Sequence, residues 1–129
     1  MVTLVGFWEY GWLEPKVELF MFRQLCAAYK VDRLVMIPTL LGPRTSVDQY
    51  DTLEEALESC SGERIFLEPS GSEHLDTFDH PEDAVYIFGK AMISNRHEEG
   101  KMVRINTPSM TDMFAVNAAA IVLDNREHG

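Results

Sequence analysis

Hydrophobic positions in the first third of the chain predict a strand, a helix and a second strand. Residues 2–7 form a short apolar run that suits a strand buried on both faces. Between residues 16 and 29 the apolar side chains recur at helical spacing, and Pro15 suits the first helical turn. Residues 33–38 favour a second strand after a short break. This order predicts a βαβ unit and therefore a parallel sheet.

The middle of the chain continues the alternation in shorter elements. After a loop expected at residues 39–51, Thr52 and Glu55 form a capping-box pattern that opens a helix, which should end near Gly62. The third and fourth strands are predicted from apolar runs, at residues 64–68 and 84–88. Polar segments with turn residues are expected to be loops, at residues 69–81 and 93–100.

The stretch from residue 103 to residue 125 predicts a buried strand, a loop and a helix. Val103 and Ile105 favour a fifth strand, which Pro108 ends. We therefore expect one α/β domain over residues 1–129, with a five-stranded, mainly parallel sheet that carries helices on both faces.

The final helix is the most apolar predicted element. Ser109 followed by Asp112 resembles a capping box, so the helix should begin at about Thr111 and run to Leu123. Its residues are apolar on nearly every side except at Asn117. A helix of this kind must be covered on more than one face, which predicts packing against the sheet and against a second subunit.

The composition is that of a water-soluble domain. Hydrophobic residues make up 46% and charged residues 25% of the chain. No apolar run approaches the roughly 18 residues of a membrane span. Residues 1–10 lack the basic region of a signal peptide and contain Glu9. Cys26 and Cys60 suit reduced thiols better than a disulfide framework, so we expect a cytoplasmic protein without a membrane partner.

The net charge argues against a simple nucleic-acid binder. Eleven Lys and Arg against 21 Asp and Glu give a formal charge of −10, which repels a polyanion at long range. The basic residues form two loose groups, Arg23, Lys30 and Arg33, and Lys90, Arg96, Lys101 and Arg104. They are compatible with a local positive patch or with scattered solvated charge.

The histidines and the aromatic residues near the start carry weaker signals. No two histidines have a spacing that places them on one helical face, so we expect solvated residues and no metal site, for His74, His80, His97 and His128. Trp8, Tyr10 and Trp12 follow the first strand. They are compatible with base stacking or with covering the core edge or a dimer interface.

Ligands of parallel α/β sheets bind beyond the carboxyl ends of the strands. Three segments occupy such positions here, at residues 88–89, 106–108 and 109–114. Gly89 allows a close backbone approach, and the first N–H groups of the final helix suit a polar or anionic group.

Three segments in this order resemble a known family. They read LCAAYKVDRLVMI at residues 25–37, VYIFGKAMIS at residues 85–94 and INTPSMTDMFAVNAAAI at residues 105–121. Over nearly its whole length the chain resembles the SpoU-type members of the α/β-knot, or SPOUT, methyltransferases. The resemblance implies a C-terminal trefoil knot, in which the last helix threads through a preceding loop.

The resemblance also implies a cofactor and a dimer. The strand-end segments would bind S-adenosylmethionine largely through backbone atoms, at Phe88, Gly89, Ile105, Asn106, Pro108, Met110, Met113 and Ala115. The family is dimeric, so the resemblance implies a homodimer through the C-terminal helix.

The chain departs from the family at its polar motif positions. Glu18 stands near the place of a family Asn, and Arg23 lies one position from the family Arg. Ala91 replaces a Glu, and Phe114 falls on the Asn of a Ser-Leu-Asn motif. Arg23 is the candidate catalytic or phosphate-binding residue, although an ordinary surface arginine is the alternative.

Two functional hypotheses follow. The first is an S-adenosylmethionine-dependent RNA methyltransferase, which by resemblance would methylate a ribose 2′-hydroxyl of tRNA or rRNA. The second is a non-catalytic knotted homodimer that binds a cofactor or a protein partner. Ala91 and Phe114 favour the second, and an acidic surface suits a basic partner.

Overall fold

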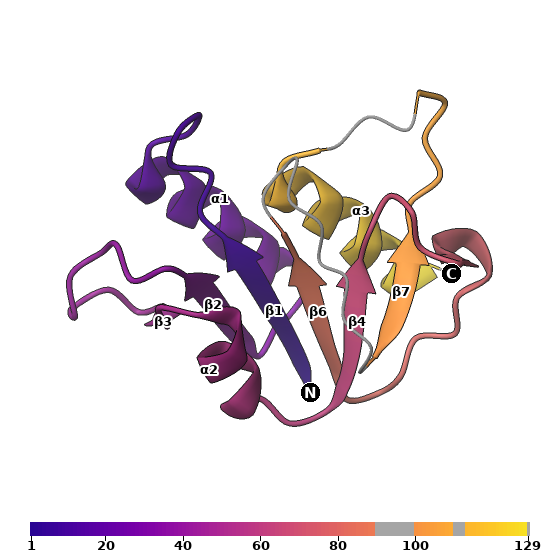
Figure 1. Cartoon of the computed structure of the whole chain (residues 1–129), viewed down its shortest axis with the longest axis horizontal. Helices are drawn as coiled ribbons and strands as arrows, with labels where there is room; N and C mark the ends of the chain where they lie inside the picture. Colours follow the sequence, from indigo (N-terminus) through magenta and orange to yellow (C-terminus); the bar gives the residue numbers. More distant parts are fainter. Residues whose placement is uncertain (90–99, 110–112, 129) are drawn as a thin grey trace.

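A parallel β-sheet runs through the centre of the molecule (Figure 1). The computed structural model describes residues 1–89, 100–109 and 113–128. Over these residues the sheet has seven strands in the order β3-β2-β1-β6-β4-β7-β5, and every pair is parallel. The strands are β1 (Val2–Phe7), β2 (Arg33–Ile37), β3 (Asp48–Gln49), β4 (Glu63–Leu67), β5 (Glu73–His74), β6 (Ala84–Phe88) and β7 (Lys101–Arg104).

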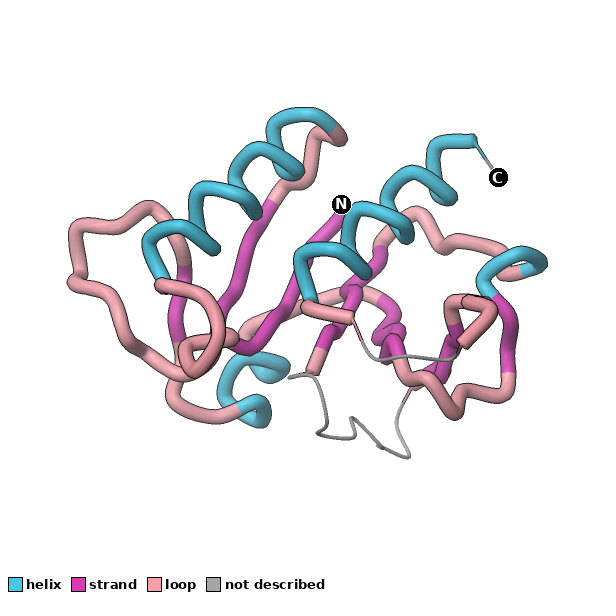
Figure 2. The backbone as a smooth tube through the Cα atoms, turned by 90° about the horizontal axis from the view of Figure 1, so that it is seen from above, coloured by secondary structure: helices cyan, strands magenta, loops and turns pink. Residues whose placement is uncertain are grey.

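Helices cover both faces of this sheet (Figure 2). The helices α1 (Pro15–Ala28) and α3 (Ala115–His128) lie on one face, and the short helix α2 (Leu53–Glu58) lies on the other. Two apolar clusters match these two faces, one with side chains of α1 and α3 and one with side chains of α2. The strand β6 is buried along its whole length between them. The α/β class, the parallel sheet and the helices on both faces are therefore confirmed.

Local sequence signals explain where two of the helices begin. Pro15 is the first residue of α1, and the Glu14 carboxylate accepts the Val17 N–H at 3.2 Å. The Thr52 hydroxyl caps α2 by accepting the Glu55 N–H at 3.2 Å, as the capping box predicted. The helix α2 ends at Glu58, earlier than predicted.

The prediction of five strands is wrong, because two-residue strands extend the sheet at both edges. The strand β3 pairs with β2 through Val35 and Asp48, and β5 pairs with β7 through Glu73 and Val103. Both short strands lie in segments predicted as loops. Two residues are too few to show an alternating pattern, so only the neighbouring strand reveals them. A single turn of 3₁₀ helix, η1 (Leu75–Thr77), follows β5.

The predicted start of the last helix is also wrong. Met113 and Phe114 precede α3, which begins at Ala115, and Asp112 of the supposed capping box lies outside the described residues. The helix continues to His128, beyond the predicted end. Contacts outside the helix hold its last turns, because Arg126 donates to the carbonyl of Pro81 at 2.7 Å and to the hydroxyl of Tyr86 at 2.9 Å.

Several sequence predictions concern parts of the chain that the structure does not describe. Met110 and Ala91 lie outside the described residues, as do Lys90, Arg96 and His97. The knot stays a prediction, since residues 90–99 and 110–112 belong to the segments that would form it. Among the described residues no helix is long and apolar enough to cross a membrane.

The segment before β5 approaches the backbone of β7 closely at Gly71. A Cβ added to this buried glycine would lie 2.9 Å from the Met102 carbonyl oxygen and 2.9 Å from the Val103 carbonyl carbon. Backbone atoms cannot move aside easily, so we expect Gly71→Ala to lower the free energy of unfolding by about 1–3 kcal/mol in urea denaturation. Gly42→Ala is the control, because an added Cβ meets nothing within 4 Å there. Equal unfolding midpoints for the two variants would contradict the close approach.

Candidate functional site

The carboxyl ends of the central strands meet at one edge of the sheet. Gly6 of β1 and Leu67 of β4 are both in register with Phe88 at the end of β6, and Leu67 is in register with Val103 of β7. The segments that follow β1, β6 and β7 therefore leave the sheet side by side. This arrangement fits the edge at which parallel sheets bind ligands.

The predicted cofactor residues divide into a buried and an exposed group. Phe88 and Ala115 are buried, and Ile105 and Met113 are half-buried against the same apolar cluster. Side chains from the end of β6, from the segment after β7 and from the start of α3 therefore belong to one apolar cluster. The exposed or partly exposed residues are Gly89, Asn106 and Pro108.

Asn106 belongs to a hydrogen-bonded network that the sequence did not predict. Its side-chain oxygen lies 2.9 Å from Nδ1 of His74, and its amide nitrogen donates to the Asp76 carboxylate at 3.0 Å. The other ring nitrogen of His74 contacts the Arg104 guanidinium. Because an arginine only donates and the Asn106 oxygen only accepts, His74 fits this network as the neutral tautomer with its proton on Nδ1. The expectation that His74 is solvated is therefore wrong.

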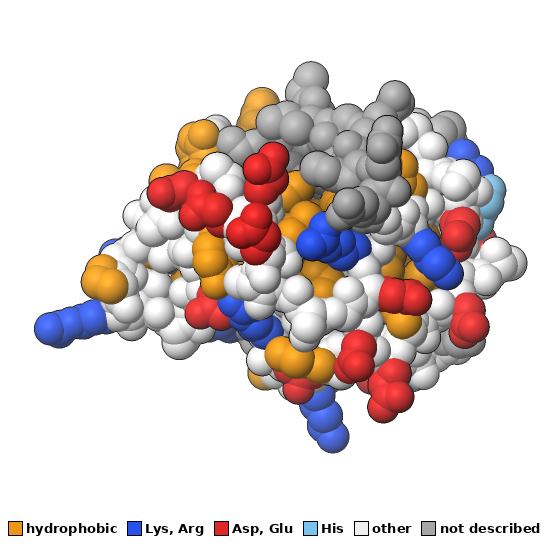
Figure 3. Space-filling model, turned by 60° about the horizontal axis from the view of Figure 1, so that its bottom comes forward, with side chains coloured by type: hydrophobic (Ala, Val, Ile, Leu, Met, Phe, Trp, Pro, Cys, Tyr) orange, Lys and Arg blue, Asp and Glu red, His pale blue; other side chains and the backbone are white. Residues whose placement is uncertain are grey.

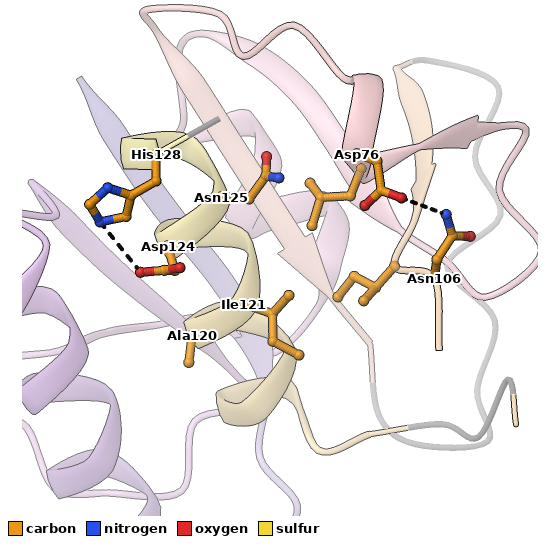
Figure 4. Close-up of a pocket in the computed structure, with 9 residues that line it drawn as sticks. Asp76, Asn106, Ala120, Ile121, Asp124, Asn125 and His128 are labelled. Carbon is orange, nitrogen blue, oxygen red and sulfur yellow. Dashed lines mark hydrogen bonds and ion pairs between the residues drawn. The ribbon is translucent and has the colours of Figure 1, made fainter. Parts of the chain in front are cut away.

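A pocket of about 490 Å³ lies next to this network, between α3 and the segments that follow β7 and β5 (Figure 4). Ile105 and Asn106 line it, opposite Ile121 of α3. Its wall also carries the carboxylates of Asp76 and Asp124. Two carboxylates disfavour a polyanion here, so this pocket does not suit a nucleic-acid backbone.

His80 is also engaged rather than solvated. Its ring nitrogens lie 2.6 Å from the hydroxyl of Tyr86 and 2.6 Å from the side-chain oxygen of Asn125. Burial raises the pKa of the Tyr86 hydroxyl, while its hydrogen bond from Arg126 lowers it. These contacts fasten the end of α3 to β6. Tyr86 is the central residue of β6, and Asn125 also lines the pocket next to the His74 network.

Arg23 lies on the exposed face of α1 and donates to the hydroxyl of Ser46. This contact joins α1 to the loop that follows β2. Within the described parts of the chain, no hydrogen bond or ion pair joins Arg23 to a predicted cofactor residue. The structure therefore joins Arg23 to the loop after β2 and not to those residues.

Glu18, which stands near the place of a family Asn, is completely buried. Its Oε1 accepts the backbone N–H of Glu9 at 2.9 Å, while its buried Oε2 has no hydrogen-bond partner among the described residues. Burial raises the pKa of Glu18 to about 7; the Glu9 N–H opposes this shift, and the negative charge of Glu9 adds to it. The carboxyl group thus anchors the turn after β1 instead of facing solvent.

The three aromatic side chains after β1 lie in different environments. Trp8 is completely buried, and its indole N–H donates to the carbonyl of Pro38 at 2.9 Å. Tyr10 and Trp12 expose 52% and 76% of their surface. Covering the core edge therefore describes Trp8, whereas Tyr10 and Trp12 are largely exposed.

Most described residues of the two basic groups lie apart from one another and interact with other side chains. Arg33 pairs with Asp48 at 2.7 Å, and the ammonium group of Lys101 lies 5.7 Å from the ring centre of Phe78. On the face drawn in Figure 3, acidic side chains are spread widely with basic side chains between them. Scattered charge therefore describes these residues better than one positive patch. In the described part of the chain, no group of three or more His, Cys, Asp or Glu could hold a metal ion.

Comparisons with known proteins identify the fold. No protein-family model matches the chain, and no curated protein does. A structure of a proposed RNA methyltransferase from Bacillus anthracis superimposes with a TM-score of 0.74 at 20% identity, covering 99% of this chain and 93% of that one. A structure concerned with 2-OH methylation of C/U34 on tRNA gives 0.75 at 17% identity, with 99% and 89% covered.

A third similar structure contains a cofactor. It is the SpoU methyltransferase AviRb from Streptomyces viridochromogenes in complex with AdoMet, with a TM-score of 0.74 at 12% identity. The match covers 99% of this chain and 59% of AviRb. The resemblance predicted from the sequence is confirmed at the level of the fold: this chain has the α/β fold of SpoU-type methyltransferase structures.

The buried carboxyl group of Glu18 predicts a particular pH dependence of stability. Because its pKa is about 7 in the folded protein against an ordinary 4.5, the folded state holds the proton more tightly than the unfolded state. The stability contributed by this group is complete below pH 4.5 and declines as the pH rises to 7. Glu18→Gln removes the decline. We therefore expect the unfolding free energy of Glu18→Gln minus that of wild type to rise by a few kcal/mol between pH 4.5 and pH 7. Each pKa unit corresponds to about 1.4 kcal/mol.

Urea denaturation at a series of pH values measures this difference. Glu58→Gln is the matched control, because Glu58 is an exposed carboxylate on α2. Its stability should follow the wild-type pH profile with a constant offset. A Glu18→Gln profile parallel to that of wild type would contradict the assignment.

Proposed function

We propose that this chain is a divergent SpoU-type SPOUT methyltransferase that transfers a methyl group from S-adenosylmethionine to RNA. The observation that carries the proposal is the superposition over 99% of the chain on structures described as RNA methyltransferases, one of them with AdoMet bound. The proposed acceptor is a ribose 2′-hydroxyl of tRNA or rRNA. The similar structure concerned with 2-OH methylation on tRNA supports this choice.

The residues at the carboxyl edge fit the proposed cofactor. The half-buried side chains of Ile105 and Met113 pack against the apolar cluster that contains Phe88, and they offer an apolar surface for an adenine ring. Gly89 lets the backbone approach, and the first N–H groups of α3 lack partners within the helix. When bound, S-adenosylmethionine supplies an electrophilic methyl group. The protein holds it and excludes water, with Asn106, Pro108, Met110 and Ala115 completing the proposed contacts.

Arg23 is the proposed residue for the substrate. It is exposed on α1, so its guanidinium group can reach a phosphate or the reacting nucleotide. Its hydrogen bond to Ser46 holds it against the loop after β2. This role places a positive charge next to the cofactor site in an otherwise acidic protein.

A second candidate function is supported by Phe114. This residue takes the place of a family Asn and packs against the apolar core cluster as a half-buried side chain. A phenyl ring can neither donate nor accept the hydrogen bonds of an amide. A non-catalytic homodimer that binds the cofactor or a protein partner is therefore the alternative.

Both candidates include a knotted homodimer formed through α3. The helices α1 and α3 lie next to each other on one face of the sheet (Figures 1 and 2). Val17 and Phe20 of α1 expose 52% and 62% of their surface, and Ile121 of α3 exposes 39%. Apolar side chains on adjacent helices suit an interface between two copies. Light scattering that gives a single 14.7 kDa chain would contradict this dimer.

Cofactor binding tests the proposal directly. Calorimetric titration with S-adenosylmethionine should give saturable heat for the wild-type protein. Gly89→Val should weaken binding by about tenfold or more, because a branched side chain blocks the backbone approach, and about 1.4 kcal/mol corresponds to a factor of ten. Gly42→Val is the control, since an added Cβ there meets nothing within 4 Å. Absence of heat at millimolar cofactor would rule out the methyltransferase and a cofactor-binding homodimer, and it would leave a homodimer that binds a protein partner.

Transfer of a labelled methyl group to bulk RNA then separates the two functions. The methyltransferase proposal expects labelled RNA with the wild-type protein and a strong loss with Arg23→Gln. Cofactor binding without any label transfer would leave the non-catalytic homodimer as the function.

A further inference from the structure

The turn between β1 and α1 presents two aromatic rings to solvent. Trp12 exposes 76% and Tyr10 exposes 52% of its surface, whereas Trp8, two residues before Tyr10, is completely buried. A tryptophan exposed to this extent contributes little to the core of its own chain. Large exposed apolar groups of this kind mark surfaces that meet another molecule.

The backbone of this turn is held firmly although its rings are exposed. The N–H groups of Trp12 and Leu13 both donate to the carbonyl of Glu9, at 2.8 and 2.7 Å. The N–H of Glu9 in turn donates to the buried carboxyl group of Glu18. Because the turn is already ordered, a ligand that stacks on its rings loses little free energy to ordering the backbone.

Exposed basic side chains outnumber exposed carboxylates in residues 10–24 and 39–47, and the carboxylate of Asp48, which follows them, pairs with Arg33 at 2.7 Å. The exposed basic side chains in these two stretches are Lys16, Arg23 and Arg44. The exposed acidic side chain in them is Glu14. The Glu14 carboxylate is engaged in capping α1. The hydrogen bond from Arg23 to Ser46 joins the two stretches. An anionic partner is therefore favoured here, although the whole chain carries a charge of −10.

The position of the turn connects it to the proposed cofactor site. The strand β1 lies next to β6, with Gly6 in register with Phe88, so the turn and Gly89 leave the same edge of the sheet. Aromatic rings beside basic side chains are the features by which proteins bind unpaired nucleotides, through stacking and phosphate contacts. We infer that the Trp12 and Tyr10 rings form a stacking platform for single-stranded RNA, with Lys16 and Arg44 at its phosphates. This inference rests on the proposed function.

Binding of a labelled single-stranded RNA of about ten nucleotides, followed by fluorescence anisotropy, tests the platform. We expect Trp12→Ala to weaken binding about tenfold or more, while Trp12→Phe retains a ring and most of the affinity. Arg44→Gln should weaken binding less and reduce its salt dependence. Lys30→Gln is the matched loss of one exposed positive charge outside the platform and should bind like wild type.

The fold and the cofactor site are checked in the same variants. Without Trp12, Trp8 is the remaining tryptophan of the chain, and its buried environment reports whether the variant is folded. Titration with S-adenosylmethionine should give wild-type affinity for Trp12→Ala. If the wild-type protein fails to bind the cofactor, the proposed function fails, whatever the RNA result.

Two results would overturn the platform while leaving the proposed function in place. The first is unchanged RNA affinity of Trp12→Ala in a protein that binds cofactor and methylates RNA. The second is a change in particle mass of Trp12→Ala by light scattering with unchanged RNA affinity, which would assign the exposed rings to an interface between copies of this chain.

Discussion

The pairing of β6 with β1 and β4 is the constraint on which the rest of the structure depends. Phe88 is in register with Gly6 on one side and Leu67 on the other, and β6 is buried along its whole length. Parallel strands cannot be joined by tight turns, so each connection must cross a face of the sheet. The helices α1 and α2 follow from this requirement, and α3 follows the last strand, β7. The same pairing brings the candidate site segments to one edge.

Two surfaces with different side chains lie near this edge of the sheet. The pocket between α3 and the end of β7 has carboxylates from Asp76 and Asp124 on its wall, which disfavour a polyanion. The turn after β1 has exposed aromatic rings and basic neighbours. In the platform that we infer, the rings and basic side chains bind a short unpaired RNA segment, whereas the carboxylates of the pocket disfavour a long duplex.

The departures from the family motifs have physical roles in this chain. Glu18 anchors the turn after β1 by accepting the Glu9 N–H, and burial holds its pKa near 7. Phe114 adds apolar contact to the core at the position of a polar residue. Glu18 holds a loop near the site through its hydrogen bond with Glu9. Phe114 removes a polar group from the site, which is why methyl transfer and simple cofactor binding remain separate functional candidates.

The sequence by itself determined the order of the main strands and helices, because long apolar runs, helical spacing and caps such as Thr52 depend on neighbouring residues alone. It also indicated the strand-end segments of the candidate site. Only the tertiary structure decided the edge strands β3 and β5, since two residues carry no periodicity and pair only when β2 and β7 are in place. It likewise joined His74 to Asn106, which stand 32 positions apart, and separated buried Trp8 from exposed Trp12. Contacts between distant residues and the burial of individual side chains depend on how the elements pack, and no local pattern records that packing.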